Sequence, residues 1–205
     1  MTAPFPPGFF DRADPSPDAS FYDQPRLVTH IDDGAIDAVG GLYEELEVRG
    51  RVLDLMSSWV SHFQRAPEEL VGLGMNDREL DANAELRARV VQDLNADPSL
   101  PFDEESFDHV VCCVSIDYLV SPLAVFDEVA RVLRPGGLFV CTFSNRCFPT
   151  KAIRGWLAAN DAGRVGIVRR YFELTEGFTP PSHDLRTGAR RFRDPLFAVW
   201  AAKAA

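Results

Sequence analysis

The chain has 205 residues and a formal net charge of −10, with 46% hydrophobic and 25% charged residues. This length suffices for one well-buried core, so we expect a single domain, 1–205, made of an amino-terminal arm, 1–31, and an α/β core, 32–205. The acidic balance argues against a nucleic-acid partner, because neutralising phosphates requires a basic face. The sequence has no leader-like start and no apolar run that would cross a bilayer, so we expect a cytoplasmic protein without a membrane partner.

The first residues combine many prolines with aromatic side chains. The prolines forbid regular structure through most of residues 1–25. Disordered tails are usually poor in aromatic residues, so we expect this arm to pack on the rest of the chain. The aromatic residues are Phe5, Phe9, Phe10, Phe21 and Tyr22.

Strand and helix patterns alternate after the arm. Asp32 or Asp33 is suited to cap a helix that reaches Leu46. Buried strands are predicted where short apolar runs occur, and a loop turning into a short helix is predicted over 57–63. The predicted strands are 51–55, 70–73, 89–92, 110–114 and 138–143, and a further helix is predicted over 77–86.

The segment 107–144 has the clearest pattern. The apolar run 110–114 suits a parallel strand buried on both faces. Ser121 and Pro122 favour the start of a helix whose apolar residues recur at helical spacing up to Leu133. The run 135–137 is proline followed by two glycines, which stops that helix and turns the chain. A strand, helix and strand joined this closely predict a right-handed parallel crossover.

The remaining segments extend the alternation. Helices are predicted over 150–157 and 165–174, and a closing pair of strands over 178–185 and 196–202. This order predicts an α/β fold, a doubly wound and mostly parallel sheet with helices on both faces.

The four cysteines carry no CxxC spacing. We interpret them as small core hydrophobes in a reducing compartment and expect neither a disulfide nor a metal site. They are Cys112, Cys113, Cys141 and Cys147.

The ordered set FDHVV, a helix ending in leucine, and LRPGG before another strand resembles the small "type 11" domains of the class I S-adenosylmethionine-dependent methyltransferases. The resemblance extends over 51–143. It implies a seven-stranded Rossmann-like sheet with an antiparallel last strand, S-adenosyl-L-methionine as cofactor and a small-molecule methyl acceptor. Whether the protein is a monomer or a homodimer stays open.

The resemblance places the cofactor beyond the carboxyl ends of the first and fourth strands, here 54–58 and 114–118. The family's acidic residue is kept as Asp54, but the alternating glycines that follow it are replaced, by residues that include Met56, Ser57 and Ser58. Either the loop binds the cofactor with altered geometry, helped by the two hydroxyls and by amides at a helix start, or it no longer binds it. Trp59 either packs in the core or faces the sulfonium through its ring.

Two further positions align with family cofactor contacts. Gly74 stands where the family has a carboxylate for the ribose, and we expect Asn76 either to replace that carboxylate or to form a turn. Asp93 aligns with the acid that accepts from the adenine amino group, and its alternative role is helix or turn capping. The other expected cofactor contacts are Leu94, Ser115, Tyr22 and Arg26.

Methyl transfer from a sulfonium is a direct displacement, and a base is needed only if the acceptor must lose a proton. The expected catalytic residues are Asp117, Tyr118 and His30, and His62 is a further candidate. Each also has an ordinary structural interpretation, in packing or in local hydrogen bonds. We expect the segment 21–31 to cover the cofactor as a lid.

The leading hypothesis is therefore a methyltransferase acting on a small molecule. The alternative is a catalytically inactive relative that binds or scaffolds, because the glycine loop and the ribose carboxylate are missing. A dinucleotide oxidoreductase is disfavoured, since no GxGxxG turn follows a strand.

Overall fold

The computed structural model describes residues 4–187 and 193–205, and these form a sheet of seven strands. The strands lie in the order β3-β2-β1-β4-β5-β7-β6, and β1 to β5 are parallel. β7 is antiparallel to both of its neighbours. The predicted mostly parallel sheet with an antiparallel last strand is confirmed. The strands are β1 (Arg51–Leu55), β2 (Glu69–Gly74), β3 (Ala88–Val91), β4 (Phe107–Cys113), β5 (Leu133–Phe143), β6 (Ser182–Thr187) and β7 (Leu196–Ala202).

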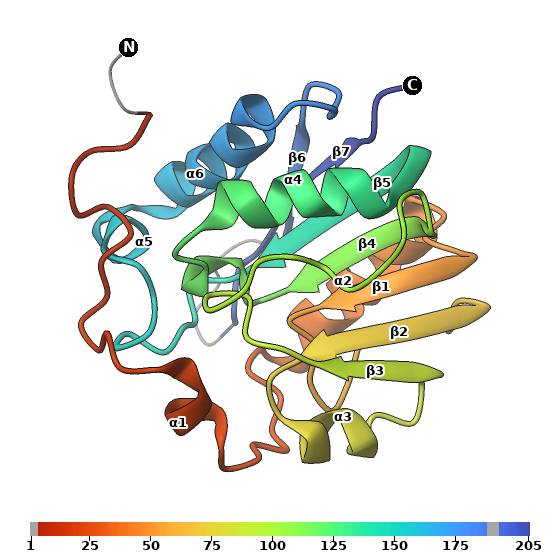
Figure 1. Cartoon of the computed structure of the whole chain (residues 1–205), viewed down its shortest axis with the longest axis horizontal. Helices are drawn as coiled ribbons and strands as arrows, with labels where there is room; N and C mark the ends of the chain where they lie inside the picture. The colour runs from red at the N-terminus through yellow and green to blue at the C-terminus, as the bar shows by residue number, and fades with distance from the viewer. Residues whose placement is uncertain (1–3, 188–192) are drawn as a thin grey trace.

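Helices cover both faces of the sheet (Figure 1). On one face, α4 (Pro122–Val132) and α6 (Asp161–Leu174) pack through Phe126, whose ring lies 4.9 Å from the rings of Phe139 and Phe172. On the other face, α2 (Asp33–Glu45) buries one apolar stripe against the central strands. The strands are therefore buried on both sides, as continuous apolar runs require. The shorter helices are α1 (Asp18–Tyr22), α3 (Asp77–Ala82), α5 (Arg154–Ala158) and the 3₁₀ helix η1 (Ile116–Tyr118).

The predictions for the first residues of α2 and α4 are confirmed in part. Asp32 caps α2, since its carboxylate accepts a hydrogen bond of 2.9 Å from the amide of Ala35. Pro122 stands at the start of α4 as predicted, where no amide partner is lost. Ser121 precedes that helix, but its side chain forms no capping hydrogen bond, so the predicted role of its hydroxyl is wrong.

The loop after β1 forms no helix over 57–63, in contrast to the prediction. The hydroxyls of Ser57 and Ser61 both donate to Asp54 at 2.6 Å, which holds the chain in an irregular course over the end of β1. α3 is also shorter than predicted, because Asn83 leaves the helix and donates to the carbonyl of Ser58.

The predicted turn at 135–137 is part of β5 instead. Gly136 donates its amide to the carbonyl of Lys203, and the amide of Lys203 donates to the carbonyl of Gly137, so the carboxyl-terminal residues extend the ladder. Gly136 has a φ of 81°, a left-handed conformation that glycine adopts without strain. Nearby, Phe178 forms an isolated bridge with Lys203, so β6 begins later than predicted.

The amino-terminal arm packs on the core, as its aromatic residues predict; residues 1–3 lie outside the described part. The ring of Phe5 lies 4.8 Å from Phe9 and 5.6 Å from Tyr171 of α6. The arm is also pinned by its backbone, because the amide of Gly155 donates to the carbonyl of Phe9. In Figure 1 the arm runs along the side of the sheet that holds the carboxyl ends of the parallel strands, and α1 lies at the lower end of that side.

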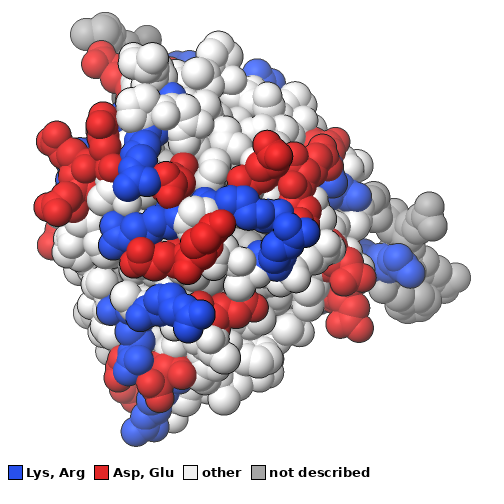
Figure 2. All heavy atoms as spheres, turned by 90° about the vertical axis from the view of Figure 1, so that its right-hand side faces the viewer, with Lys and Arg blue, Asp and Glu red and all other residues white. Residues whose placement is uncertain are grey.

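Charges of both signs alternate on the face at the amino-terminal ends of the parallel strands, which Figure 2 shows. Ion pairs account for much of this pattern, among them Arg51 with Glu69 at 3.1 Å and Arg49 with Glu44. This face offers no continuous basic surface of the kind that binds phosphate backbones.

Gly74 at the end of β2 provides a stability test. A Cβ there would lie 2.2 Å from the carbonyl oxygen of Ser57, a backbone atom that has no room to move aside. We expect Gly74→Ala to lower the free energy of unfolding by about 2 kcal/mol or more in urea denaturation.

Gly166→Ala is the matched control, because nothing lies within 4 Å of the added Cβ in α6. It should be neutral or stabilising by up to about 1 kcal/mol, as alanine favours a helix. Equal stability of the two variants would contradict the packing described for Gly74.

Candidate active site

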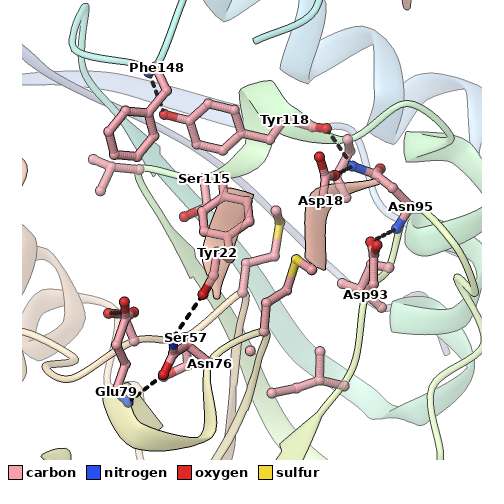
Figure 3. Close-up of a pocket in the computed structure, with 18 of the residues that line it drawn as sticks. Asp18, Tyr22, Ser57, Asn76, Glu79, Asp93, Asn95, Ser115, Tyr118 and Phe148 are labelled. Atoms are coloured by element: carbon pink, nitrogen blue, oxygen red, sulfur yellow. Dashed lines mark hydrogen bonds between the residues drawn. The ribbon is translucent and has the colours of Figure 1, made fainter. Parts of the chain in front are cut away.

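A cavity of about 280 Å³ lies at the carboxyl ends of β1 to β4, and the amino-terminal arm forms one of its walls (Figure 3). The strand order reverses between β1 and β4, which is where open α/β sheets bind their ligands. Most of the predicted site residues meet on its walls. These are Tyr22, Arg26, His30, Met56, Ser57, Ser58, Asn76, Asp93, Leu94, Ser115 and Tyr118.

The loop after β1 keeps a glycine-like backbone without glycine. Met56 has a φ of 58°, in the left-handed region that glycine favours, and it lines the cavity. A left-handed conformation costs a non-glycine residue about 1 kcal/mol or more. The loop is held there because the amide of Ser57 donates to the carbonyl of Leu73 in β2 at 2.8 Å.

Asp54 lies beneath this loop and does not line the main cavity. Its side chain is buried, and burial raises its pKa from 3.8 to about 6, although the hydroxyls of Ser57 and Ser61 oppose the shift. The carboxyl therefore organises the loop from below.

The end of β2 has no side chain for a steric reason. The carbonyl of Ser57 occupies the space that a Cβ at Gly74 would need, so a carboxylate cannot stand there. Asn76 reaches the cavity wall but its polar atoms are all engaged. Its amide donates to the carbonyls of Tyr22 and Asp23, and its oxygen accepts from two amides at the start of α3 (Figure 3).

Asp93 and Asn95 form the polar wall after β3. One carboxylate oxygen of Asp93 accepts from the amide of Asn95 at 2.9 Å, and the other has no hydrogen-bond partner in the described residues. The side chain of Asn95 donates to Asp18 of α1 and to the carbonyl of Tyr118. Asn95 thus connects the loops after β3 and β4 with the arm (Figure 3).

Asp18 is the point where the arm is fixed to the core. It is 3% exposed and accepts from Arg12 at 2.7 Å, from Asn95 at 2.8 Å and from the fully buried ammonium of Lys151 at 3.1 Å. Burial alone would raise the pKa of Asp18, but the hydrogen bonds from Arg12, Asn95 and Lys151 together hold it below its usual value. The carboxylate is therefore ionised in the folded protein.

Glu79 joins the arm to the altered loop. Its carboxylate accepts from the backbone amide of Arg26 and from the hydroxyl of Ser58, each at 2.6 Å. The guanidinium of Arg26 lies 4.5 Å from the ring of Phe21. These contacts lay the segment 21–31 along the cavity.

Aromatic rings form the opposite wall. The hydroxyl of Tyr118 accepts from the amide of Phe148 at 2.9 Å, and burial raises the pKa of Tyr118. The ring of Phe148 lies 5.3 Å from those of Phe21 and His30. One side of the cavity is therefore flat and apolar, with polar groups on the other (Figure 3).

A second cavity of about 50 Å³ adjoins the first. Asp54 and His62 line this one alone, whereas His30, Met56 and Val114 line both. Because these walls are shared, a ligand in one cavity would lie next to a ligand in the other.

Asp117, predicted as catalytic, lines neither cavity. Its side chain is 2% exposed, and burial raises its pKa to about 8. The sequence reasoning also missed several wall residues. Asn95 follows the same predicted strand as Asp93, so its place after a strand end could have predicted it. No local sequence pattern predicts the remaining residues. The missed residues include Asp18, Glu79, Asn95 and Phe148.

The described residues contain neither a helix long and apolar enough to cross a membrane nor a group of three His, Cys, Asp or Glu side chains placed to hold a metal ion. Four free cysteines are present, of which Cys112 and Cys141 are buried in β4 and β5.

The strand order, the antiparallel β7 and the cavity at the strand ends define a Rossmann-like methyltransferase fold. An S-adenosylmethionine dependent methyltransferase from Mesorhizobium loti shares this fold, with a TM-score of 0.55 at 17% identity over 81% of this chain and 98% of that one. The model of the methyltransferase-domain family matches residues 50–141, from the start of β1 into β5. This match covers somewhat less than half of the chain, and the fold that the structure shows is the one that S-adenosylmethionine-dependent methyltransferases share.

Curated relatives match shorter stretches. A demethylmenaquinone methyltransferase of Mycobacterium sp. (strain KMS) is 49% identical over 55 residues, which are 25% of this chain and 24% of the relative. A ubiquinone biosynthesis O-methyltransferase of Xylella fastidiosa (strain 9a5c) is 28% identical over 106 residues, 51% of this chain and 39% of the relative. The match thus spans well under half the length of either relative.

The raised pKa of Asp54 predicts a pH-dependent stability. In the unfolded chain this carboxyl ionises near pH 4, whereas the folded protein keeps its proton up to about pH 6. Stability from Asp54 is therefore present below pH 4 and is lost as the pH rises to about 6.

Asp54→Asn removes this titration. The free energy of unfolding of the wild type minus that of the variant should fall by up to about 3 kcal/mol over this range, since one pKa unit is worth about 1.4 kcal/mol. Urea denaturation at several pH values measures the difference. A difference that is flat or that rises with pH would contradict the burial of an isolated carboxyl.

Proposed function

We propose that this protein is an S-adenosylmethionine-dependent methyltransferase that acts on a small molecule. The observation that carries the proposal is the cavity at the ends of β1 to β4, in a chain that has the methyltransferase fold and matches the methyltransferase-domain model over residues 50–141. The cavity volume of about 280 Å³ is close to the lower end of small-molecule sites, typically about 300–1,000 Å³.

The residues of the main cavity fit this cofactor, with one substitution. We assign to the adenine amino group the carboxylate oxygen of Asp93 that has no hydrogen-bond partner among the described residues. Gly74 has no room for the ribose carboxylate and Asn76 has no polar atom left, so we assign the ribose to Glu79, the carboxylate that lines the same end of the cavity. Glu79 retains acceptor capacity, because each oxygen accepts only one hydrogen bond.

The cofactor supplies an electrophilic methyl group on a sulfonium, which calls for alignment rather than for acid catalysis. The chain provides alignment through the rigid ends of four strands and excludes water through the arm. Tyr22, Arg26 and His30 of the arm line the cavity, which supports the proposal that 21–31 acts as a lid.

We propose a flat, ring-containing acceptor. Val28 and the ring of Trp59, which line the second cavity beside the cofactor cavity, favour contact with an apolar ring. The names of both curated relatives refer to quinones or their biosynthesis, which agrees with this choice.

Calorimetry with S-adenosylmethionine and S-adenosylhomocysteine tests the proposal. We expect both to bind, and we expect Asp93→Ala to weaken binding about tenfold to a hundredfold, as the loss of a hydrogen bond to a charged group implies. Binding of neither compound at millimolar concentration would contradict the proposed function and would favour the catalytically inactive alternative.

Asp97→Ala is the matched control. Asp97 accepts from an amide two residues ahead, as Asp93 does, but it is exposed and does not line the cavity. Its substitution should leave the affinity unchanged. Equal losses in the two variants would remove Asp93 from the adenine site.

A further inference from the structure

We infer that the second cavity is the methyl-acceptor subsite and that His62 takes the proton which a ring hydroxyl of the acceptor loses. The inference rests on the proposed function and assigns the chemistry of one of its parts. It names the acceptor class as a hydroxylated aromatic ring.

The position of the second cavity supports this role. It shares His30, Met56 and Val114 with the main cavity, so the junction between the two lies where a transferred group would cross. Its own walls include Val28, which is 54% exposed, and Trp59, so one side is open and apolar. A volume of about 50 Å³ admits one edge of a ring and not a whole second cofactor.

Backbone strain converges on this cavity. Met56, His62 and Val114 have φ values of 58°, 60° and 45°, and all three line it. Left-handed backbone is rare for residues other than glycine, and for a β-branched valine it is a true outlier. Such strain persists where the surrounding structure holds it, and it clusters at sites of binding and catalysis. Here the amide of Val114 is held by the carbonyl of Thr142 at 2.8 Å.

The two histidines of the cavity differ from His109 in their hydrogen bonding. Neither the ring of His30 nor that of His62 is hydrogen-bonded within the described residues, whereas His109 uses its ring to accept from the amide of Leu138. Burial lowers the pKa of His62, and His30 opposite lowers it further. Burial also lowers the pKa of His30, against the effect of Glu79 and in line with that of Arg26. Asp54, on the same cavity, is already bound by two hydroxyls.

Geometry selects His62 over His30 as the base. His30 lines the junction of the cavities, on the side from which the methyl group arrives. His62 lines the second cavity alone, so it faces the acceptor from the far side, where the leaving proton points. A phenolic hydroxyl has a pKa of about 10, so a neutral imidazole can take its proton as the methyl group is transferred. An aliphatic alcohol is much less acidic, and for this reason we choose a phenolic acceptor.

The step balances. The hydroxyl oxygen forms a bond to the methyl carbon while the carbon–sulfur bond breaks, and the bonding pair stays on sulfur as a thioether. The hydroxyl proton moves to an imidazole nitrogen of His62. The imidazolium then releases it to water through the open side of the cavity.

Nuclear magnetic resonance with labelled histidine tests the subsite, with catechol as probe and saturating S-adenosylhomocysteine. We expect catechol to shift the resonances of His30 and His62 and not that of His183, which lies on the exposed edge strand β6. A titration that shifts neither cavity histidine would overturn the assignment.

Methylation of catechol tests the base. His62→Gln should lower the rate about a hundredfold and abolish the fall in rate that we expect of the wild type at acidic pH, because a protonated imidazole accepts no proton. Its affinity for S-adenosylmethionine by calorimetry should stay within twofold, and His183→Gln should match the wild type in every assay.

An unchanged rate and pH profile in His62→Gln would overturn the role of His62. So would a wild type that binds S-adenosylmethionine yet leaves catechol unmethylated. Failure of the wild type to bind the cofactor at all is a different result, and it would contradict the proposed function itself.

Discussion

The buried ion pair between Asp18 of the arm and Lys151 of the core is the electrostatic contact that fixes the arm beside the cavity. Lys151 is fully buried, and among the described residues the partners of its ammonium all come from the arm: Asp14, Ser16 and Asp18. Removing one partner of such a pair costs about 3–5 kcal/mol, because a buried charge is left without compensation. The arm is therefore fixed over the cavity by charge, and its aromatic residues then pack beside it.

One packing choice explains both departures from the family pattern. The loop after β1 lies so close to β2 that the carbonyl of Ser57 fills the space beside Gly74. This approach removes the position for a ribose carboxylate, and the left-handed Met56 lets the loop turn without glycine. Glu79 lies in α3, the helix that follows β2, and its carboxylate lines the same end of the cavity. The missing glycines and the missing acid are thus coupled changes.

The sequence predicts the sheet well, because a buried parallel strand needs a continuous apolar run and a covering helix needs a stripe at helical spacing. Both patterns are local. Most of the predicted site residues line the main cavity, and many of them were found because they follow strand ends, where the fold places its ligands. Asp18 and Lys151 escape prediction, since their pairing joins segments 133 positions apart and no pattern near either residue reports it. The loop expected to turn into a short helix over 57–63 forms no helix, because the hydroxyls of Ser57 and Ser61 donate to Asp54. Helix propensity along the sequence does not report these hydrogen bonds. Asp117 follows a strand end but is buried in η1 and lines neither cavity. Its distance along the sequence from β4 does not predict this.

We propose that the arm, fixed by Asp18, covers the cofactor in the cavity at the ends of β1 to β4. A crystal structure of the protein with S-adenosylhomocysteine tests it most directly. The account predicts the adenine beside Asp93, the ribose beside Glu79, and the arm in place with Tyr22 and Arg26 over the ligand. A ligand bound elsewhere on the sheet, or bound with the Asp18 and Lys151 pair broken and the arm displaced, would contradict it.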